Sequence, residues 1–329
     1  MAETTRAVRA QGLLSSLATE ATVLEARHGL ESSNATLHSN QSAGLARVLQ
    51  RLLRGQTVRV FVVGGSAAAG AGGVGVNGTF DARLVASFNR LLARVEKTRS
   101  LSPLGRLVRM NVAQGGTTSF WAGLMAEPLH SRRAHLLLWE YAINDHAVSL
   151  EAASKVAGGT AAAALSTDSM RFMMEYWLRR VASLRPPPAL LLTYLWDKQP
   201  GVAFKPGNRA LCRKLPVPAS AFRAQRSTLE HYRPLGGGMA ALDVAGYVSE
   251  QARGSGGSLC PLVADAYYHP SDKGHQLVSE LLMLLLLRRM LAEGIAEAAP
   301  DASPQERRSA SISVRVPSTA SRQPIAPPS

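Results

Sequence analysis

Residues 57–66 read TVRVFVVGGS, an apolar run rich in β-branched side chains that ends at two glycines and a serine. Such a run, bounded by glycine, is typical of a strand that is buried on both faces. A buried strand that leads into a glycine-rich turn is a common first unit of an α/β sheet. We therefore predict a strand at Thr57–Val63 and a tight turn that exposes the hydroxyl of Ser66.

The same alternation of strand and helix patterns continues toward the C-terminus. Further strands are predicted at Leu107–Val112, Ala134–Glu140, Ala189–Leu195 and Met239–Val244. Helices are predicted at Asp81–Thr98, after Thr118, at Ser169–Leu184 and at Ser271–Ala292. Apolar strands separated by helices indicate a mostly parallel sheet that is covered on both faces. The predicted fold is a three-layer α/β/α sandwich with about five strands.

Three segments outside this alternation complete the predicted organisation. Residues 1–54 carry helical periodicity and form a helical N-terminal extension, with a polar loop at Ser32–Ser42. Residues 55–293 form the α/β domain, in which residues 197–234 are a long insertion rich in proline and basic residues. Residues 294–329 are rich in alanine, serine and proline, a composition typical of disorder.

Composition indicates a protein with a large hydrophobic core and argues against a nucleic-acid partner, a transmembrane helix and a metal site. The chain has 329 residues, of which 46% are hydrophobic, so a large core is expected. The net charge is +14, but the basic residues are scattered and no nucleic-acid motif accompanies them, so no nucleic-acid partner is expected. The apolar run Leu281–Leu287 is far shorter than the roughly 20 residues of a transmembrane helix and indicates a buried helix. Histidine and cysteine spacing indicates no metal site, no cofactor is expected, and no obligate protein partner is implied.

The sequence leaves the cellular compartment open. Its amino terminus shows no clear secretory signal. N-glycosylation triplets begin at Asn34, Asn40 and Asn77, and they are compatible with passage through the secretory pathway. Two cysteines, Cys212 and Cys260, are equally compatible with one disulfide and with two thiols.

Four segments carry side chains suited to catalysis, and they lie where a parallel sheet collects functional groups, at or near strand ends. They are GGS at 64–66, NVAQGGTTS at 111–119, WEYAIND at 139–145 and DAYYHPSDKGH at 265–275. In this order they resemble the four signature blocks of the SGNH/GDSL hydrolase family. The resemblance implies Ser66 as nucleophile, His269 as general base and no cofactor. Asp265 is the candidate carboxylate that orients the imidazole.

The resemblance also implies a set of donors for the oxyanion that forms during ester cleavage. These donors are the backbone N–H of Ser66, the backbone N–H of Gly115 or Gly116, and the side-chain amide of Asn144. The implied reaction is hydrolysis of an acyl ester, acetyl esters included, through an acyl-enzyme. A small-molecule, lipid or glycan ester is the expected substrate.

The chain departs from the family pattern at three points. Gly65 stands where the family has aspartate, Ala142 stands where it has glycine, and one extra residue separates Asp265 from His269. Two alternatives to hydrolysis stay open. One is a carbohydrate O-acyltransferase on the same scaffold, and the other, which the altered blocks make plausible, is a catalytically inactive carbohydrate-binding relative.

Further residues near the blocks have expected roles. Trp196 and Asp197 follow a predicted strand and are expected to shape the substrate pocket, with ordinary loop packing as the alternative. Asp145 is expected to bond backbone amides beside the site, and His275 is expected to pack the last helix.

Overall fold

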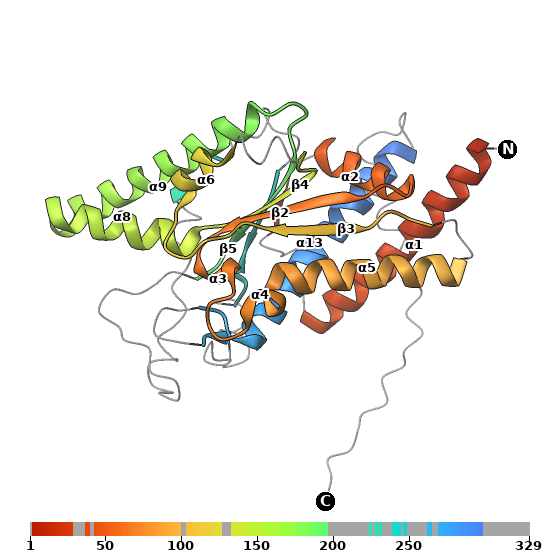
Figure 1. Cartoon of the computed structure of the whole chain (residues 1–329), viewed down its shortest axis with the longest axis horizontal. Helices are drawn as coiled ribbons and strands as arrows, with labels where there is room; N and C mark the ends of the chain where they lie inside the picture. The colour runs from red at the N-terminus through yellow and green to blue at the C-terminus, as the bar shows by residue number, and fades with distance from the viewer. Residues whose placement is uncertain are drawn as a thin grey trace, which may run out of the picture.

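The computed structural model describes residues 2–28, 37–39, 43–99, 103–126, 133–196, 224–225, 228–229, 231, 239–244, 246–248, 262–264 and 269–298. These residues form a six-stranded sheet with helices on both faces, a three-layer α/β/α sandwich (Figure 1). Several residues singled out above lie outside the described residues: Asn34, Asn40, Asp197, Cys212, Cys260 and Asp265.

Five strands of the sheet run parallel, which confirms the predicted sheet. They are β2 (Val58–Gly64), β3 (Leu107–Asn111), β4 (Leu136–Glu140), β5 (Ala189–Tyr194) and β6 (Met239–Asp243). The strand order is β1-β6-β5-β4-β2-β3, and β1 (Leu37–Ser39) pairs antiparallel with β6. Strand β1 contradicts the predicted polar loop at Ser32–Ser42. A strand of three residues has little local signal, and its pairing with β6 comes from distant residues.

Strand β2 lies between β3 and β4 and brings their carboxyl ends together. Val62 is opposite Asn111 of β3, and Gly64 is opposite Glu140 of β4. The segments that follow these three strands therefore meet at one edge of the sheet.

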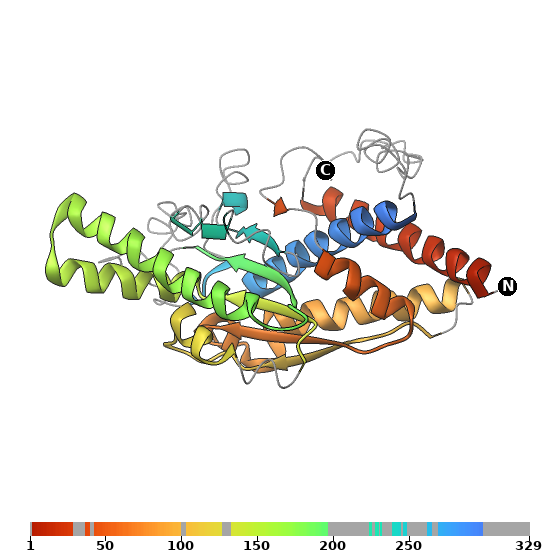
Figure 2. The ribbon, with the colours of Figure 1, turned by 90° about the horizontal axis from the view of Figure 1, so that it is seen from above.

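One group of helices packs around α13 (Asp272–Ala298). It contains α1 (Ala2–His28), α2 (Ala43–Leu53) and α5 (Phe80–Arg99), and α1 runs beside α13 (Figure 2). Because neighbours surround α13, all seven residues of Leu281–Leu287 are buried. None of the described helices is long and apolar enough to cross a membrane.

The second group consists of α6 (Ser119–Leu124), α8 (Ala142–Val156) and α9 (Gly159–Ala182). Helices α8 and α9 form a hairpin that extends beyond the strands (Figure 1). Helix α8 was not predicted, and α9 begins earlier than the predicted Ser169. Asn144 and Asp145 lie in the first turn of α8.

Candidate active site

Ser66 is the first residue of α3 (Ser66–Ala69), directly after β2 and Gly65. The Gly65 N–H donates to the carbonyl of Glu140 at 2.8 Å, which fixes the turn against β4. A Cβ on Gly64 would lie 2.5 Å from the Ala68 Cβ and 2.8 Å from the Glu140 carbonyl oxygen. A glycine at position 64 is therefore needed for the strand, the helix and β4 to approach this closely.

His269 faces this serine from the loop that leads into α13. Its Nε2 lies 2.8 Å from Ser66 Oγ, although 203 positions separate the two residues. Backbone pairing fixes the loop, because the Ala264 N–H donates to the His269 carbonyl at 2.8 Å and Val263 bridges to Pro270. The structure thus brings together the two residues that the sequence predicts as nucleophile and base.

A glycine-rich loop after α3 packs directly on this histidine. Gly72 has φ +92°, and a Cβ there would lie 2.7 Å from the Pro270 carbonyl oxygen and 3.2 Å from the His269 Cβ. Left-handed backbone and close approach both require glycine at this point. The loop therefore helps to hold the His269 backbone near Ser66.

The two glycines of the second block have different environments. A Cβ on Gly115 would lie 3.5 Å from the Ser66 Cβ, whereas Gly116 has φ +76° and nothing within 4 Å of such a Cβ. Gly115 is thus beside the serine, and Gly116 makes the turn. No described residue accepts a hydrogen bond from the N–H of Ser66 or Gly115, so both groups are available as donors.

The Asn144 side chain borders the same space. Its Nδ2 donates to the carbonyl of Thr117 at 2.6 Å, which orients the amide and leaves its second N–H. A Cβ on Gly65 would lie 2.5 Å from Asn144 Nδ2, so the amide lies against the backbone just before Ser66. Ser66, Gly115 and Asn144 therefore approach one another at the carboxyl edge of the sheet.

A buried polar cluster around Asp145 holds the helix that carries Asn144 in place. Asp145 accepts hydrogen bonds from the Ser119 N–H at 2.8 Å, the Ser119 hydroxyl at 2.6 Å and the Gln225 side chain at 3.2 Å. The Trp139 indole N–H donates to the Ser119 hydroxyl at 3.0 Å. Burial raises the pKa of Asp145 to about 6, while its bonds to Ser119 and Gln225 oppose that rise. The cluster ties α8, which carries Asn144, to the start of α6.

Glu140 is a second buried carboxyl group, and sequence reasoning missed it. It ends β4, is 1% exposed and accepts a hydrogen bond from the Ala68 backbone. Burial raises the pKa of this carboxyl to about 8, the bond from Ala68 lowers it, and the charge of Asp145 adds to the rise. A carboxylate in an otherwise apolar strand was the signal that could have identified it.

The remaining predicted residues have the following positions. Trp196 is 2% exposed and packs in the core, so its place in a substrate pocket stays a prediction.

His275 is buried, accepts the Phe80 N–H on Nδ1 at 3.2 Å and stacks on the Phe80 ring. Burial lowers the pKa of His275 to about 4, which keeps the ring neutral. Among the described residues, no group of three or more histidine, cysteine, aspartate or glutamate side chains could hold a metal ion.

No protein-family model matches the chain, and no curated protein matches it in sequence. Among solved structures, the chain is similar to a two-domain esterase (CEX) active on acetylated mannans, which was co-crystallised with mannopentaose. The two chains are 18% identical and superpose with a TM-score of 0.53. The match covers 76% of this chain and 56% of the esterase. A second structure of a two-domain esterase (CEX) active on acetylated mannans matches at 17% identity with a TM-score of 0.51, covering 76% and 54%. A GDSL-like lipase from Parabacteroides merdae matches at 12% identity with a TM-score of 0.46, covering 72% and 96%. This chain spans little more than half of the two-domain esterase, and the likeness to that esterase shows a shared α/β fold.

Proposed function

We propose that the protein is a serine esterase that cleaves an acyl ester through an acyl-enzyme on Ser66. The observation that carries the proposal is the 2.8 Å distance between Ser66 Oγ and His269 Nε2. A serine hydroxyl becomes an effective nucleophile when an adjacent imidazole accepts its proton. Structural uses of serine, such as capping a helix, do not require an imidazole at this distance.

The proposed reaction has two halves. In the first, Ser66 Oγ attacks the ester carbonyl carbon while His269 Nε2 takes the hydroxyl proton. The tetrahedral intermediate then collapses, the C–O bond to the alcohol breaks, and His269 returns the proton to the departing alcohol. In the second half, water attacks the acyl-enzyme with His269 again as base, which releases the acid and restores Ser66.

Three donors near Ser66 are suited to stabilise the oxyanion in both halves. They are the N–H groups of Ser66 and Gly115 and the second side-chain N–H of Asn144. Fixed donors of this kind stabilise a developing negative charge because they need no reorganisation during the reaction. Removing one such donor costs about 3–4 kcal/mol of transition-state stabilisation in a well-studied serine hydrolase.

We propose that Asp265 is the carboxylate that orients the His269 imidazole, and this role can be tested separately. An orienting carboxylate holds the imidazole in the tautomer that accepts the serine proton. If Asp265 has this role, Asp265→Ala should lower turnover far more than an exposed control such as Asp168→Ala. If the two variants are alike, the site works as a dyad of Ser66 and His269.

Acetylated glycans are the first substrates to test. The two-domain esterase that shares the fold is described as active on acetylated mannans. An O-acyltransferase on the same scaffold would transfer the acyl group from Ser66 to a sugar acceptor, so added acceptor should then outcompete water. A catalytically inactive relative would bind the glycan without turnover.

Labelling with a fluorophosphonate probe tests the nucleophile without knowledge of the substrate. The wild-type protein should label, and Ser66→Ala and His269→Ala should not. Ser154→Ala is the matched control, because Ser154 is exposed on α8 and bonds the Glu151 carbonyl there. A folded wild-type protein that fails to label, or labelling that persists in Ser66→Ala, would refute the esterase proposal.

A further inference from the structure

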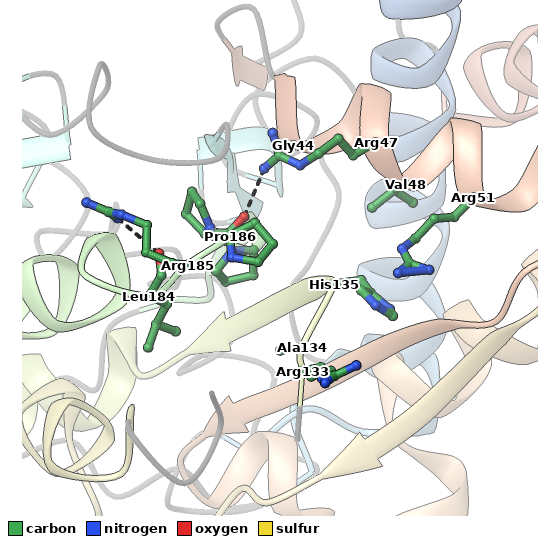
Figure 3. A pocket seen from close by; sticks show the side chains of 12 residues that line it. Gly44, Arg47, Val48, Arg51, Arg133, Ala134, His135, Leu184, Arg185 and Pro186 are labelled. Carbon is green, nitrogen blue, oxygen red and sulfur yellow. Dashed lines mark hydrogen bonds between the residues drawn. The ribbon is translucent and has the colours of Figure 1, made fainter. Parts of the chain in front are cut away.

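A second concave site lies at the other end of the sheet from Ser66. Helix α2, residues 133–135 before β4 and the proline segment before β5 enclose a volume of about 630 Å³ (Figure 3). Strands β4 and β5 run parallel from this site, and β4 ends at Glu140 beside the nucleophile turn. The pocket is therefore separated from the candidate active site by the length of the strands.

Positive side chains dominate the polar lining of this pocket. Arg47, Arg51, Arg133 and Arg185 line it, and the part of its lining that the structure describes contains no aspartate or glutamate. None of these four arginines forms an ion pair with a described residue. Like charges repel one another, so such a concentration is favourable for an incoming anion.

Two of the arginines are held in place from α2. Arg47 donates to the Pro187 carbonyl at 2.9 Å, and Arg51 donates to the Gln56 side chain at 3.0 Å. Each guanidinium has five N–H groups, so these bonds orient the side chains and leave further donors. Arg185 instead bonds the Ala182 and Leu184 carbonyls and points away from the centre of the group in Figure 3.

The backbone at Arg133 has an unusual conformation. Its φ is +53°, in the left-handed region that favours glycine, and it is the one non-glycine residue with positive φ among the described residues. A glycine would reach this conformation at lower cost but would carry no guanidinium. Such outliers often occur at binding sites, where the surrounding structure maintains them.

His135 contributes a neutral donor between these arginines. Its Nδ1 accepts the Arg59 backbone N–H at 2.9 Å, so the proton of the neutral ring is on Nε2. Burial and the nearby Arg51 and Arg59 lower the pKa of His135 to about 4, which keeps the ring neutral near pH 7. The ring lies close to the Arg51 guanidinium in Figure 3. The polar side chains of the pocket thus offer N–H donors.

We propose that this pocket binds a small molecule bearing a phosphate or sulfate group, held by Arg47, Arg51, Arg133 and the Nε2–H of His135. Guanidinium groups bind tetrahedral oxyanions through paired, charge-assisted hydrogen bonds. A volume of about 630 Å³ exceeds what the anion alone would fill, so the ligand carries a larger organic part against the apolar and proline walls. The proposal does not depend on ester hydrolysis.

Calorimetric titration of the full chain with inorganic phosphate, pyrophosphate and sulfate at low ionic strength tests the proposal. We expect binding of at least one of these anions, weakened at least about tenfold in Arg51→Gln. Arg51→Lys keeps the charge but loses the paired geometry, so it should also bind more weakly than wild type. Arg90→Gln is the matched control, because Arg90 is exposed on α5 and outside the pocket, and it should stay within about twofold of wild type.

Two further variants and a comparison of the anions complete the test. Arg133→Gln replaces Arg51→Gln if the latter melts at a lower temperature, and Ser66→Ala should bind as wild type does. Tighter binding of inorganic phosphate than of sulfate would indicate a phosphorylated ligand, and the reverse a sulfated one. The absence of binding of all three anions at about 10 mM, well above the roughly 1 mM dissociation constant of a weak site, would overturn the proposal. Equal weakening in Arg90→Gln, or binding to polyanions such as heparin without binding to small anions, would overturn it too.

Discussion

Residue 65 is glycine where the SGNH/GDSL pattern has aspartate, and in this structure the Asn144 side-chain amide lies directly beside it. A Cβ at this position would lie 2.5 Å from Asn144 Nδ2 and 2.8 Å from its Cγ. The space that a side chain at position 65 needs is therefore occupied by the asparagine. The departure at Gly65 is compatible with a tightly packed site around Ser66.

Gly65→Ala should displace the Asn144 amide and lower esterase turnover by about 10²-fold, the effect of losing one oxyanion donor. The backbone itself tolerates alanine, because Gly65 has φ −80° and ψ −157°. Gly158→Ala is the control, since Gly158 has φ −113° and no atom within 4 Å of an added Cβ. Steady-state kinetics would contradict the argument if Gly65→Ala and Gly158→Ala had equal turnover.

Ser119→Ala should destabilise the protein through the buried cluster beneath the site. The substitution removes the hydroxyl that donates to Asp145 at 2.6 Å and accepts the Trp139 indole N–H at 3.0 Å. A buried polar group left without its partner costs about 1–3 kcal/mol, so urea unfolding should show a loss of that size. The exposed Ser183→Ala should change the free energy of unfolding by less than about 0.5 kcal/mol. Equal losses would show that the cluster contributes little to stability.

At the scale of elements, the sequence predicts structure where local pattern and burial agree. Strand β2 is apolar on both faces and ends at glycines, and all but one of its residues are buried. Helix α8 was missed because its first turn contains Asn144 and Asp145, whose side chains also favour turns. Strand β1 exists through its pairing with β6, which is about 200 positions away, so no local pattern predicts it.

Leu17→Ala tests whether the N-terminal helices belong to the core. Leu17 of α1 is 0% exposed, and α1 packs on α13, which carries the buried run Leu281–Leu287. A leucine truncated in such a position costs about 2–5 kcal/mol, so chemical denaturation should show a loss in that range. Val23→Ala, at a side chain that is 47% exposed, should cost much less. If Leu17→Ala left the stability unchanged, residues 1–54 would behave as a separate extension.

At the scale of the whole molecule, parallel topology explains why the candidate site could be predicted from sequence. Ser66, Asn144 and His269 come from distant segments, yet each follows a strand or leads into the last helix, and the carboxyl ends of parallel strands meet. The supporting contacts were not predictable in the same way. Glu140 has one sequence signal, its place at the end of an apolar strand, but the hydrogen-bond partners of Glu140 and Ser119 come from other elements, and the sequence does not show them. The arginine pocket is equally hidden, because α2 and the segments before β4 and β5 supply its charges from separate parts of the chain.

Glu140 should make the global stability depend on pH. Its pKa is 4.5 in a reference peptide and about 8 in the folded protein. Below pH 4.5 the carboxyl is neutral in both states, so its burial costs least there. As the pH rises from 4.5 to about 8, the unfolded chain releases the proton first, and the free energy of unfolding falls by up to ~1.4 kcal/mol per pH unit.

Glu140→Gln should abolish this contribution, because glutamine keeps the shape and an acceptor for the Ala68 N–H but cannot ionise. Urea unfolding of both proteins from pH 5 to pH 9 measures it, and the difference in unfolding free energy should grow with pH until about 8. Asp145 and the histidines are common to both proteins, so their titrations largely cancel in that difference. Glu151→Gln is the control, since the Glu151 side chain is 69% exposed and pairs with Lys155 on the surface of α8. If the free energy of unfolding had the same pH dependence in Glu140→Gln as in wild type, Glu140 would already be ionised at neutral pH. Water or a rearranged hydrogen-bond donor would then have to reach its carboxylate beneath the nucleophile turn.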